Sequence, residues 1–247
     1  MTQGKAQADL PKRFYTDVTL APSDTGYAIL LDGRPVKTPG RRPLAVPMRR
    51  AAEIVAAEWD AQRERIDPAT MPMTRLVNTV IEAIADDPNP VRDDLARYIE
   101  TDLLFYRAGS PHRLVVRQRE MWDPVLDWAR ETFGGRYLLT EGVMHVGQPP
   151  AGIAAFRERL ASIDDPFRVA ALHQVTTLTG SALLALAVAE RHLSAADAWM
   201  RAHVDEDWNI DQWGADDEAS ARREMRWQEM QVASVLLTDD EPADARP

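Results

Sequence analysis

The sequence predicts an α+β protein with a small N-terminal antiparallel β domain followed by a larger, mostly α-helical domain. Between residues 13 and 47, short apolar runs alternate with turn signals, which is typical of paired strands. From residue 47 onward, apolar residues recur every three or four positions, as they do on the buried face of a helix. The 247 residues are enough for one large domain or two modest ones. We therefore expect residues 1–47 to form the β-rich domain and residues 48–237 the helical domain.

The N-terminal strands are bounded by recognisable turn sequences. Residues 13–20 and 27–31 are extended runs on either side of a Ser-Asp-Thr-Gly turn, and Asp32-Gly33 is a hairpin signal. Residues 34–40 and 44–46 continue the extended pattern, and a later stretch at 137–146 could add to the same sheet. The segment from Gly33 to Ala52 holds six basic residues and no acidic one, so charge is segregated along the chain.

The remaining elements are predicted to be helices separated by proline and glycine breaks. The clearest breaks are residues 86–90, which contain Pro88 and Pro90, then Gly134-Gly135 and Gly180. Residues 238–247 are acidic and contain proline, so we expect a disordered tail. The predicted helices span residues 48–65, 74–85, 91–104, 114–133, 153–163, 166–179, 181–192, 195–213 and 217–237.

The composition narrows the class of protein. A hydrophobic content of 45% and a charged content of 28% are typical of soluble globular proteins, and the net charge of -10 argues against nucleic acid as a partner. The chain has no cysteine, and we expect its N-terminal residues to be neither a secretory signal nor a transit peptide. The apolar run at 169–189 is interrupted by polar residues and Gly180, so we expect a buried helix pair without stable membrane insertion. A cytoplasmic protein is the simplest expectation.

The most unusual segment is Asp205–Glu218, which holds seven carboxylates, no lysine or arginine, and two tryptophans. Helical steps of three and four from Trp199 reach the stripe His203, Glu206, Ile210 and Trp213. Glu206 is therefore expected on an aromatic and aliphatic face, whereas Trp208 points away from it. Gly214 ends this helix, and the acids that follow are typical of the start of the next one.

Signatures for phosphate, dinucleotide, serine-nucleophile and zinc-protease chemistry are absent from the sequence. His203 and Glu206 could share a metal ion, with carboxylates recruited from Glu82, Asp93 and Glu100, although a His–Glu hydrogen bond is the simpler interpretation. The other candidate groups have structural interpretations that are at least as good. They are His173-Gln174 as core polar groups, Asp123-Pro124 as a helix start, the patch Tyr98, Thr101, Asp102 and Tyr106 as helix packing, and the basic hairpin Arg34–Lys37 as a solvated edge that discourages strand addition.

Several segments, taken in order, resemble one family. They run from about residue 13 to residue 235, and it is their order and spacing together that make the match specific. The segments are Arg13-Phe14-Tyr15, residues 27–39 (YAILLDGRPVKTP), residues 58–62 (EWDAQ), residues 71–74 (MPMT), residues 101–107 (TDLLFYR), Trp122-Asp123-Pro124, and residues 205–208 (DEDW) with 212–214 (QWG). This pattern is similar to the ATP-twelve family, the assembly chaperones of the ATP synthase alpha subunit.

The resemblance implies a non-catalytic protein without a cofactor, which holds the free alpha subunit of the catalytic head until the beta subunit replaces it. It also implies a small β-rich domain before a helical one and, because the chain lacks a presequence, a bacterial member. The family's functional acidic residue corresponds best to Glu206, whether it touches the client or holds the helix that does. Two alternatives remain, a carboxylate–histidine metalloenzyme and a general peptide-binding module. The expected partner-binding residues are Asp205, Glu206, Asp207, Trp208, Asp211 and Trp213.

Overall fold

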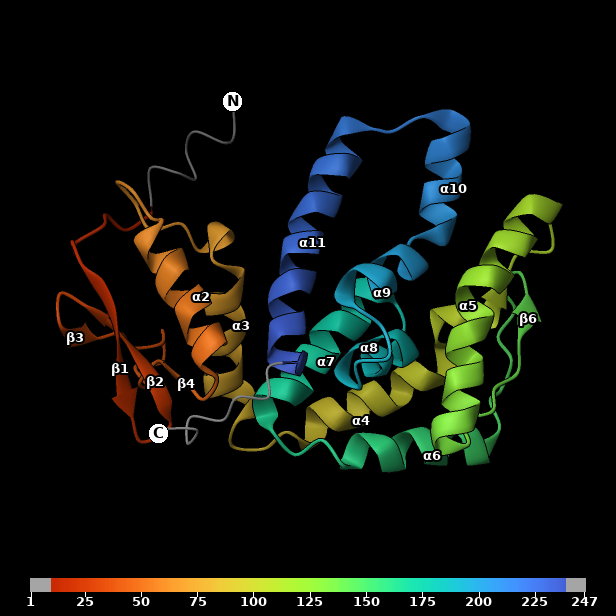
Figure 1. Ribbon diagram of the computed structural model, residues 1–247, viewed down its shortest axis with the longest axis horizontal. Coiled ribbons are helices and arrows are strands. Elements are labelled where there is room, and N and C mark those ends of the chain that lie inside the picture. The colour runs from red at the N-terminus through yellow and green to blue at the C-terminus, as the bar shows by residue number, and fades with distance from the viewer. Residues whose placement is uncertain (1–9, 239–247) are drawn as a thin grey trace. The chain divides into compact units, whose positions relative to one another are not determined.

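The protein is described from a computed structural model that covers residues 10–238 (Figure 1). The tail predicted at 238–247 therefore lies outside the described residues, apart from Thr238. The chain divides into two compact units, one ending at Asp86 and the other spanning Asp87–Thr238. Antiparallel strands come first and helices dominate the rest, which confirms the predicted α+β class.

The sheet of the first unit is built on one central strand. β1 (Val18–Ser23) pairs antiparallel with β2 (Gly26–Leu31). β3 (Arg34–Pro35) and β4 (Ala45–Val46) both pair with β2 as well. The hairpin between β2 and β3 turns through Asp32 and Gly33, with φ of 47° and 76°. Positive φ at both central residues gives a twist that matches the flanking strands, so the Asp-Gly signal in the sequence is explained.

The first unit also contains helices, so it extends beyond the boundary expected at residue 47. α2 (Arg49–Asp60) buries Ala51, Ala52 and Val55. α3 (Pro72–Thr79) follows a 3₁₀ turn at Pro68–Thr70 and continues into one π-helical turn, Val80–Ile84. A small sheet exposes too much backbone and apolar surface to stand alone. Here α2 packs against β1, β2 and β4, and α3 packs against α2.

The second unit is a helical assembly around two buried helices. α7 (Pro166–Thr179) ends at Gly180, whose φ is 69°, and α8 (Ala182–Ala189) begins at the N-cap Ser181. Every residue of α8 is buried, as is most of α7, so the predicted buried helix pair is confirmed. No helix among residues 10–238 is long and apolar enough to cross a membrane. The other helices are α4 (Asn89–Tyr98), α5 (His112–Phe133), α6 (Pro150–Ala161), α9 (Ala195–Ala202), α10 (Val204–Trp213) and α11 (Asp217–Thr238).

A carboxylate is completely buried at the start of α8. Oδ1 of Asp102 accepts a hydrogen bond from the backbone N–H of Leu104, and Oδ2 accepts one from Leu183, both at 3.0 Å. Asp102 thus satisfies free N–H groups at the N-terminus of α8 and joins that helix to residues 99–105. Burial raises the pKa of Asp102 to about 6, although the hydrogen bonds oppose the rise. Within the patch of Tyr98, Thr101, Asp102 and Tyr106, this residue therefore has a packing role.

Three local predictions for residues 91–146 differ from the structure. Residues 137–146 form one short strand, β6 (Thr140–Glu141), which pairs in parallel with β5 (Tyr106–Arg107) and not with the N-terminal sheet. The predicted helix at 91–104 ends at Tyr98 and continues as 3₁₀ turns. Pro124 lies inside α5, so Asp123 is no N-cap; its carboxylate instead pairs with Arg107 at 2.9 Å.

Candidate functional site: a groove between two helices

The sequence at 195–213 was expected to form one helix, but the chain turns at His203. The backbone there has φ of −109° and ψ of 19°, which ends α9 and starts α10 in a new direction. Gly214, with φ of 87°, then ends α10, and α11 follows after two further residues. Figure 1 shows α10 and α11 as two arms joined by this short turn.

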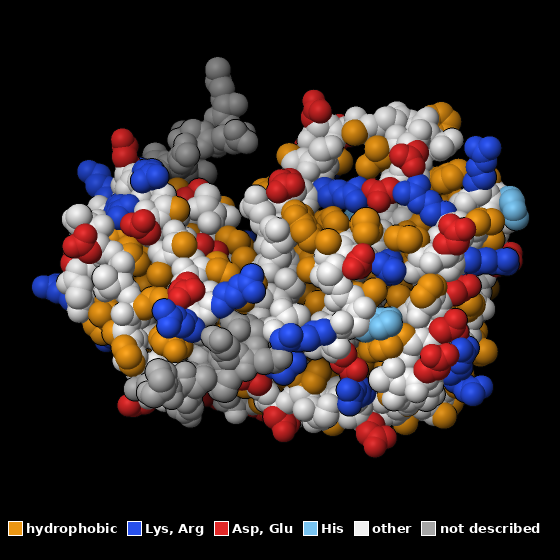
Figure 2. Space-filling view, viewed as in Figure 1, with side chains coloured by type: hydrophobic (Ala, Val, Ile, Leu, Met, Phe, Trp, Pro, Cys, Tyr) orange, Lys and Arg blue, Asp and Glu red, His pale blue; other side chains and the backbone are white. Residues whose placement is uncertain are grey.

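A pocket of about 440 Å³ opens between these arms. Figure 2 shows hydrophobic and charged side chains together at the opening. Three carboxylates and one guanidinium are among the lining groups, so the pocket has a negative balance. The lining residues are Trp199, Glu206, Asn209, Ile210, Trp213, Gly214, Asp216, Ala219, Ser220, Arg223, Glu224 and Trp227.

Indole rings form the apolar part of the pocket. Trp199 is 8% exposed, and its ring centroid lies 5.5 Å from that of Trp227 on α11. Trp213, at the end of α10, is 86% exposed. A tryptophan with so much apolar surface in water is typical of a binding surface, because no contact within the described chain covers it.

His203 contacts Trp199, one of the pocket-lining residues, through both its ring and a hydrogen bond. Its ring lies 4.0 Å from the ring of Trp199, centroid to centroid, and its Nδ1 lies 2.8 Å from the backbone oxygen of Trp199. Only a protonated Nδ1 can donate to that carbonyl oxygen, so the assigned tautomer leaves Nε2 as an acceptor. Burial lowers the pKa of His203, and the backbone hydrogen bond and Glu206 oppose this only in part. The imidazole is therefore neutral at pH 7.

Five of the six predicted partner-binding residues separate into two groups. The three aspartates bind other parts of the second unit: Asp205 accepts from Gln118 at 2.7 Å, Asp211 from Arg117 at 2.8 Å, and Asp207 from Arg223 at 2.5 Å. They hold α10 against α5 and α11. Glu206 and Trp213, in contrast, line the pocket.

Glu206 is the least constrained of these carboxylates within the described residues. Its side chain is 42% exposed, and Nε2 of the neutral His203 ring lies 3.7 Å from its Oε2. That distance is too long for a hydrogen bond. Trp208 is half-buried and is not part of the pocket lining, which agrees with the prediction that it points away from the stripe.

Sequence reasoning missed the second wall of the groove. Arg223 and Trp227 belong to α11, a helix whose high polar content conceals its contribution. The available signal was their spacing of four residues, which places both on one face of a helix.

The residues proposed for metal binding are not brought together. Within residues 10–238, no group of three or more His, Asp or Glu side chains is arranged to hold an ion. Glu82 belongs to the first unit, where it accepts a short hydrogen bond from the backbone N–H of Gly40 that lowers the pKa of Glu82. Asp93 and Glu100 lie on α4 and the turn after it. The other histidine considered, His173, forms a hydrogen bond with Asp94; its Nε2 lies 2.8 Å from Oδ2 of Asp94, and both side chains are partly exposed.

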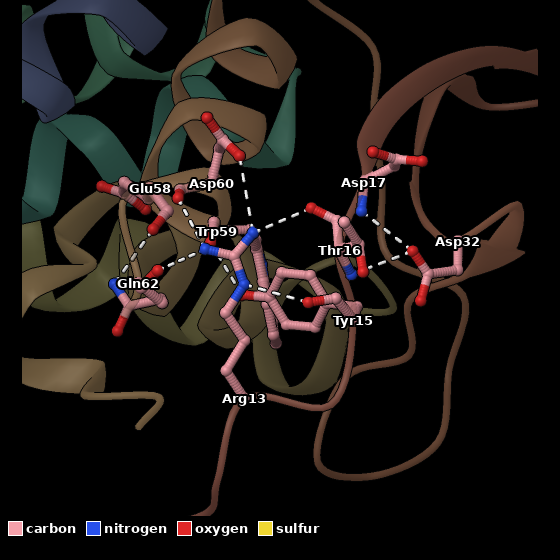
Figure 3. A network of polar contacts seen from close by, with 9 residues as sticks. All are labelled: Arg13, Tyr15, Thr16, Asp17, Asp32, Glu58, Trp59, Asp60 and Gln62. Atoms are coloured by element: carbon pink, nitrogen blue, oxygen red, sulfur yellow. Dashed lines mark hydrogen bonds and ion pairs between the residues drawn. The ribbon is translucent and has the colours of Figure 1, made fainter. Parts of the chain in front are cut away.

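The first unit contains a dense polar network around Arg13 (Figure 3). The guanidinium donates to the backbone oxygens of Tyr15, Thr16, Asp60 and Gln62, and the Tyr15 hydroxyl donates to that of Trp59. Nearby, Glu58 accepts from the backbone N–H groups of Met73 and Thr74, each at 2.7 Å, and so caps α3 from a neighbouring helix. These polar groups are hydrogen-bonded within the first unit, so we assign them a structural role.

Comparison with known proteins identifies relatives with the same architecture. The sequence model of the ATP12 chaperone protein family matches residues 12–130. The crystal structure of Atu1473, a candidate chaperone from Agrobacterium tumefaciens, is 49% identical with a TM-score of 0.88, over 98% of this chain and 92% of that one. Atp12 from Paracoccus denitrificans is 38% identical with a TM-score of 0.84, over 94% and 99% of the two chains.

An aspartate-to-lysine mutant of the Paracoccus protein gives the same result, with 39% identity and a TM-score of 0.83, over 92% of this chain and 97% of that one. The fold and its relatives define the class as a chaperone. The chain belongs to the ATP12 chaperone family.

Proposed function

We propose that this protein is an assembly chaperone for ATP synthase, which binds the free alpha subunit of the catalytic head until the beta subunit replaces it. Membership of the ATP12 family supports the proposal, together with the motifs that run from Arg13 to Gly214. An unassembled alpha subunit exposes apolar surface intended for beta, and such surface aggregates when it is left uncovered. The proposal places the protein in the bacterial cytoplasm, where synthase subunits are made.

The observation that carries the proposal is the groove between α10 and α11. Interfaces draw most of their energy from a few aromatic anchors that are surrounded by polar groups. Trp213 offers such an anchor at the mouth of the pocket, and Trp199 and Trp227 offer an apolar floor. A client segment that combines an apolar side chain with a basic one fits both the indoles and the negative balance of the lining.

Glu206 is the natural partner for the basic group of that segment. Its carboxylate lies among the indoles, where partial desolvation strengthens a charge-assisted hydrogen bond. The contributions of Asp205, Asp207 and Asp211 are indirect, because their ion pairs and hydrogen bonds hold α10 in place. Trp208 is half-buried outside the pocket lining and is not part of the proposed contact. Because the chain belongs to a family of chaperones, stoichiometric capture without ATP hydrolysis is expected.

The test is refolding of purified alpha subunit at low concentration, followed by light scattering and size-exclusion chromatography. The wild-type chaperone should suppress scattering at a one-to-one ratio and elute in a complex that the beta subunit dissolves. Glu206→Lys should weaken capture by about a hundredfold, because it places a cation against the basic group of the client. Trp213→Ala should weaken it by about tenfold.

Glu158→Lys provides the matched control, since Glu158 is an exposed carboxylate on α6 and does not line the pocket. It makes the same change in charge and should capture the subunit like the wild type. Failure of the wild-type protein to bind unassembled alpha subunit would refute the proposal. Equal losses for the Glu158 and Glu206 variants would show that net charge, and not the groove, governs binding.

A further inference from the structure

A second pocket lies in the first unit, whereas the proposed client-binding groove lies in the second unit. It has a volume of about 510 Å³. Strands, the hairpin between β2 and β3, and α2 all contribute to it. The lining residues are Phe14, Tyr15, Leu31, Asp32, Arg34, Pro35, Val36, Lys37 and Trp59.

The apolar part of this pocket includes an aromatic ring that is largely exposed to solvent. Phe14 is 73% exposed, and its ring packs edge-on against Tyr15 with the centroids 5.4 Å apart. Around it, Tyr15 and Arg13 have their polar groups committed to backbone oxygens (Figure 3). The hydrogen bonds of Arg13 and Tyr15 fix the backbone on both sides of Phe14, whose ring is mostly exposed to solvent.

The charged part of the pocket is basic. Arg34 and Lys37 are both exposed, and neither forms an ion pair within residues 10–238. The one carboxylate in the lining, Asp32, accepts hydrogen bonds from the backbone N–H groups of Thr16 and Asp17 through Oδ1. These bonds, together with the nearby charges of Arg13 and Arg34, hold the pKa of Asp32 below its ordinary value, so this exposed carboxylate stays ionised. With two cations, Arg34 and Lys37, against one carboxylate, Asp32, the lining has a positive balance, in a protein whose net charge is -10.

A partner is not expected to bind here by adding a strand to the edge of β3. Pro35 is the second residue of β3 and has no N–H group, so an added strand would lack a ladder hydrogen bond there. A partner would therefore have to be recognised by side chains, namely the guanidinium of Arg34, the ammonium of Lys37 and the ring of Phe14.

We propose that this pocket is a second protein-binding site, which takes an extended acidic segment carrying an aromatic or branched apolar side chain. The apolar side chain packs on Phe14 and Trp59, and carboxylates on either side of it pair with Arg34 and Lys37. The charge preference is the opposite of that in the α10–α11 groove, whose lining has three carboxylates and one guanidinium. The protein therefore has two sites that select client segments of different composition. The second site does not depend on the function proposed for the first.

The experiment uses the full-length protein and a fluorescein-labelled eight-residue peptide that alternates glutamate with leucine and phenylalanine. Fluorescence anisotropy measures binding, with a lysine-for-glutamate peptide and an all-glutamate peptide for comparison. The acidic apolar peptide should bind tightest, the all-glutamate peptide more weakly, and the lysine peptide not at all. Added salt should weaken binding, because exposed charges are screened.

The decisive variant is the double change Arg34→Glu with Lys37→Glu, which should weaken binding by more than about tenfold. Its control is Arg50→Glu with Arg63→Glu, which makes the same charge change at two exposed positions of the first unit outside the pocket. The control should change the affinity by less than about twofold. Phe14→Ser should weaken binding several-fold, while Glu206→Lys should leave it unchanged, so failure here is distinct from failure of the alpha-subunit proposal.

Three results would overturn the inference. The first is an equal loss in both charge-reversed proteins, which would indicate a general electrostatic effect. The second is equal binding of the acidic and lysine peptides. The third is binding to phosphatidylserine vesicles, with the same Arg34 and Lys37 dependence and no peptide binding, which would make the pocket a membrane-surface contact. The milder variant Arg34→Ala with Lys37→Ala repeats the test if charge reversal disturbs the fold.

Discussion

The core around Asp102 and the groove around Glu206 use carboxylates in opposite ways. Both oxygens of Asp102 accept backbone N–H groups, and the residue is completely buried. Glu206 is 42% exposed, and among residues 10–238 no hydrogen bond to its carboxylate is found; Nε2 of His203 lies 3.7 Å away. A carboxylate whose oxygens are committed to the fold stabilises the native state, whereas one left open is available to a partner. Acidity alone therefore does not mark the site; the missing internal partner does.

The largest effect on stability is expected for Asp102→Ala. This change leaves buried N–H groups of Leu104 and Leu183 without acceptors, and it should lower the free energy of unfolding by about 3 kcal/mol. Urea denaturation followed by circular dichroism at pH 7 measures it. Asp93→Ala, at an exposed position on α4, is the control and should stay within about 0.5 kcal/mol of the wild type. Equal effects of the two substitutions would contradict the role assigned to Asp102.

The next effect is expected for Glu58→Ala in the first unit. Glu58 is the cap of α3, because the N-cap residue Met71 supplies no side-chain hydrogen bond. Loss of a cap that accepts two backbone N–H groups should cost about 2 kcal/mol. Hydrogen exchange should show lost protection at Met73 and Thr74, with the α10–α11 groove unaffected. Uniform loss of protection across both units would show that Glu58 is not a local cap.

Much of the fold could be predicted from local sequence, as the α7–α8 pair shows. Gly180 supplies the positive φ that ends α7, and Ser181 caps α8, so two adjacent residues predict the break. The Asp32-Gly33 hairpin was predictable for the same reason. The break at His203 was not, because no proline or glycine marks it. It depends on tertiary contacts, including the burial of Trp199 and His203, which no pattern of period 3.6 contains.

The candidate site could be predicted only in part. Its stripe from Trp199 to Trp213 was predicted from spacing, and the pocket contains Trp199, Glu206, Ile210 and Trp213. The division between supporting aspartates and the open glutamate could not be predicted, since it depends on Arg117, Gln118 and Arg223, which lie on other helices. Which acid is left without a partner is a tertiary property.

Breaking the support of α10 should have a smaller effect on stability than on binding. Asp207→Arg removes the 2.5 Å pair with Arg223 and should cost about 0.5 to 1 kcal/mol, because both side chains are partly exposed. The loss of binding free energy for the alpha subunit should exceed the loss of unfolding free energy, since α11 forms one wall of the groove. The charge-swapped double variant, Asp207→Arg with Arg223→Asp, should restore binding. If the double variant binds no better than the single one, the pair does not position the groove.

The smallest effect on stability is expected from the titration of His203, which tests whether the charge of Glu206 is truly open. Burial lowers the pKa of His203 below its ordinary value of 6.5, so the unfolded chain binds a proton more readily than the native state. Its contribution to stability is therefore present above pH 6.5 and is lost as the pH falls through the lower folded pKa. Arg223 and Arg226 act in the same direction as burial, while Glu206 opposes it.

Wild-type protein should lose more unfolding free energy between about pH 7.5 and pH 5 than His203→Gln does, as measured by urea denaturation at each pH. The variant His145→Gln, at an exposed position, should follow the wild type. A neutral imidazole at pH 7 leaves the charge of Glu206 without compensation beside it, which is the condition for binding a basic group of the client. Parallel curves for wild type and His203→Gln would mean that His203 is as readily protonated in the native state as in the unfolded chain. Glu206 would then have a protonated neighbour at mildly acidic pH, and its contrast with Asp102 would be weaker.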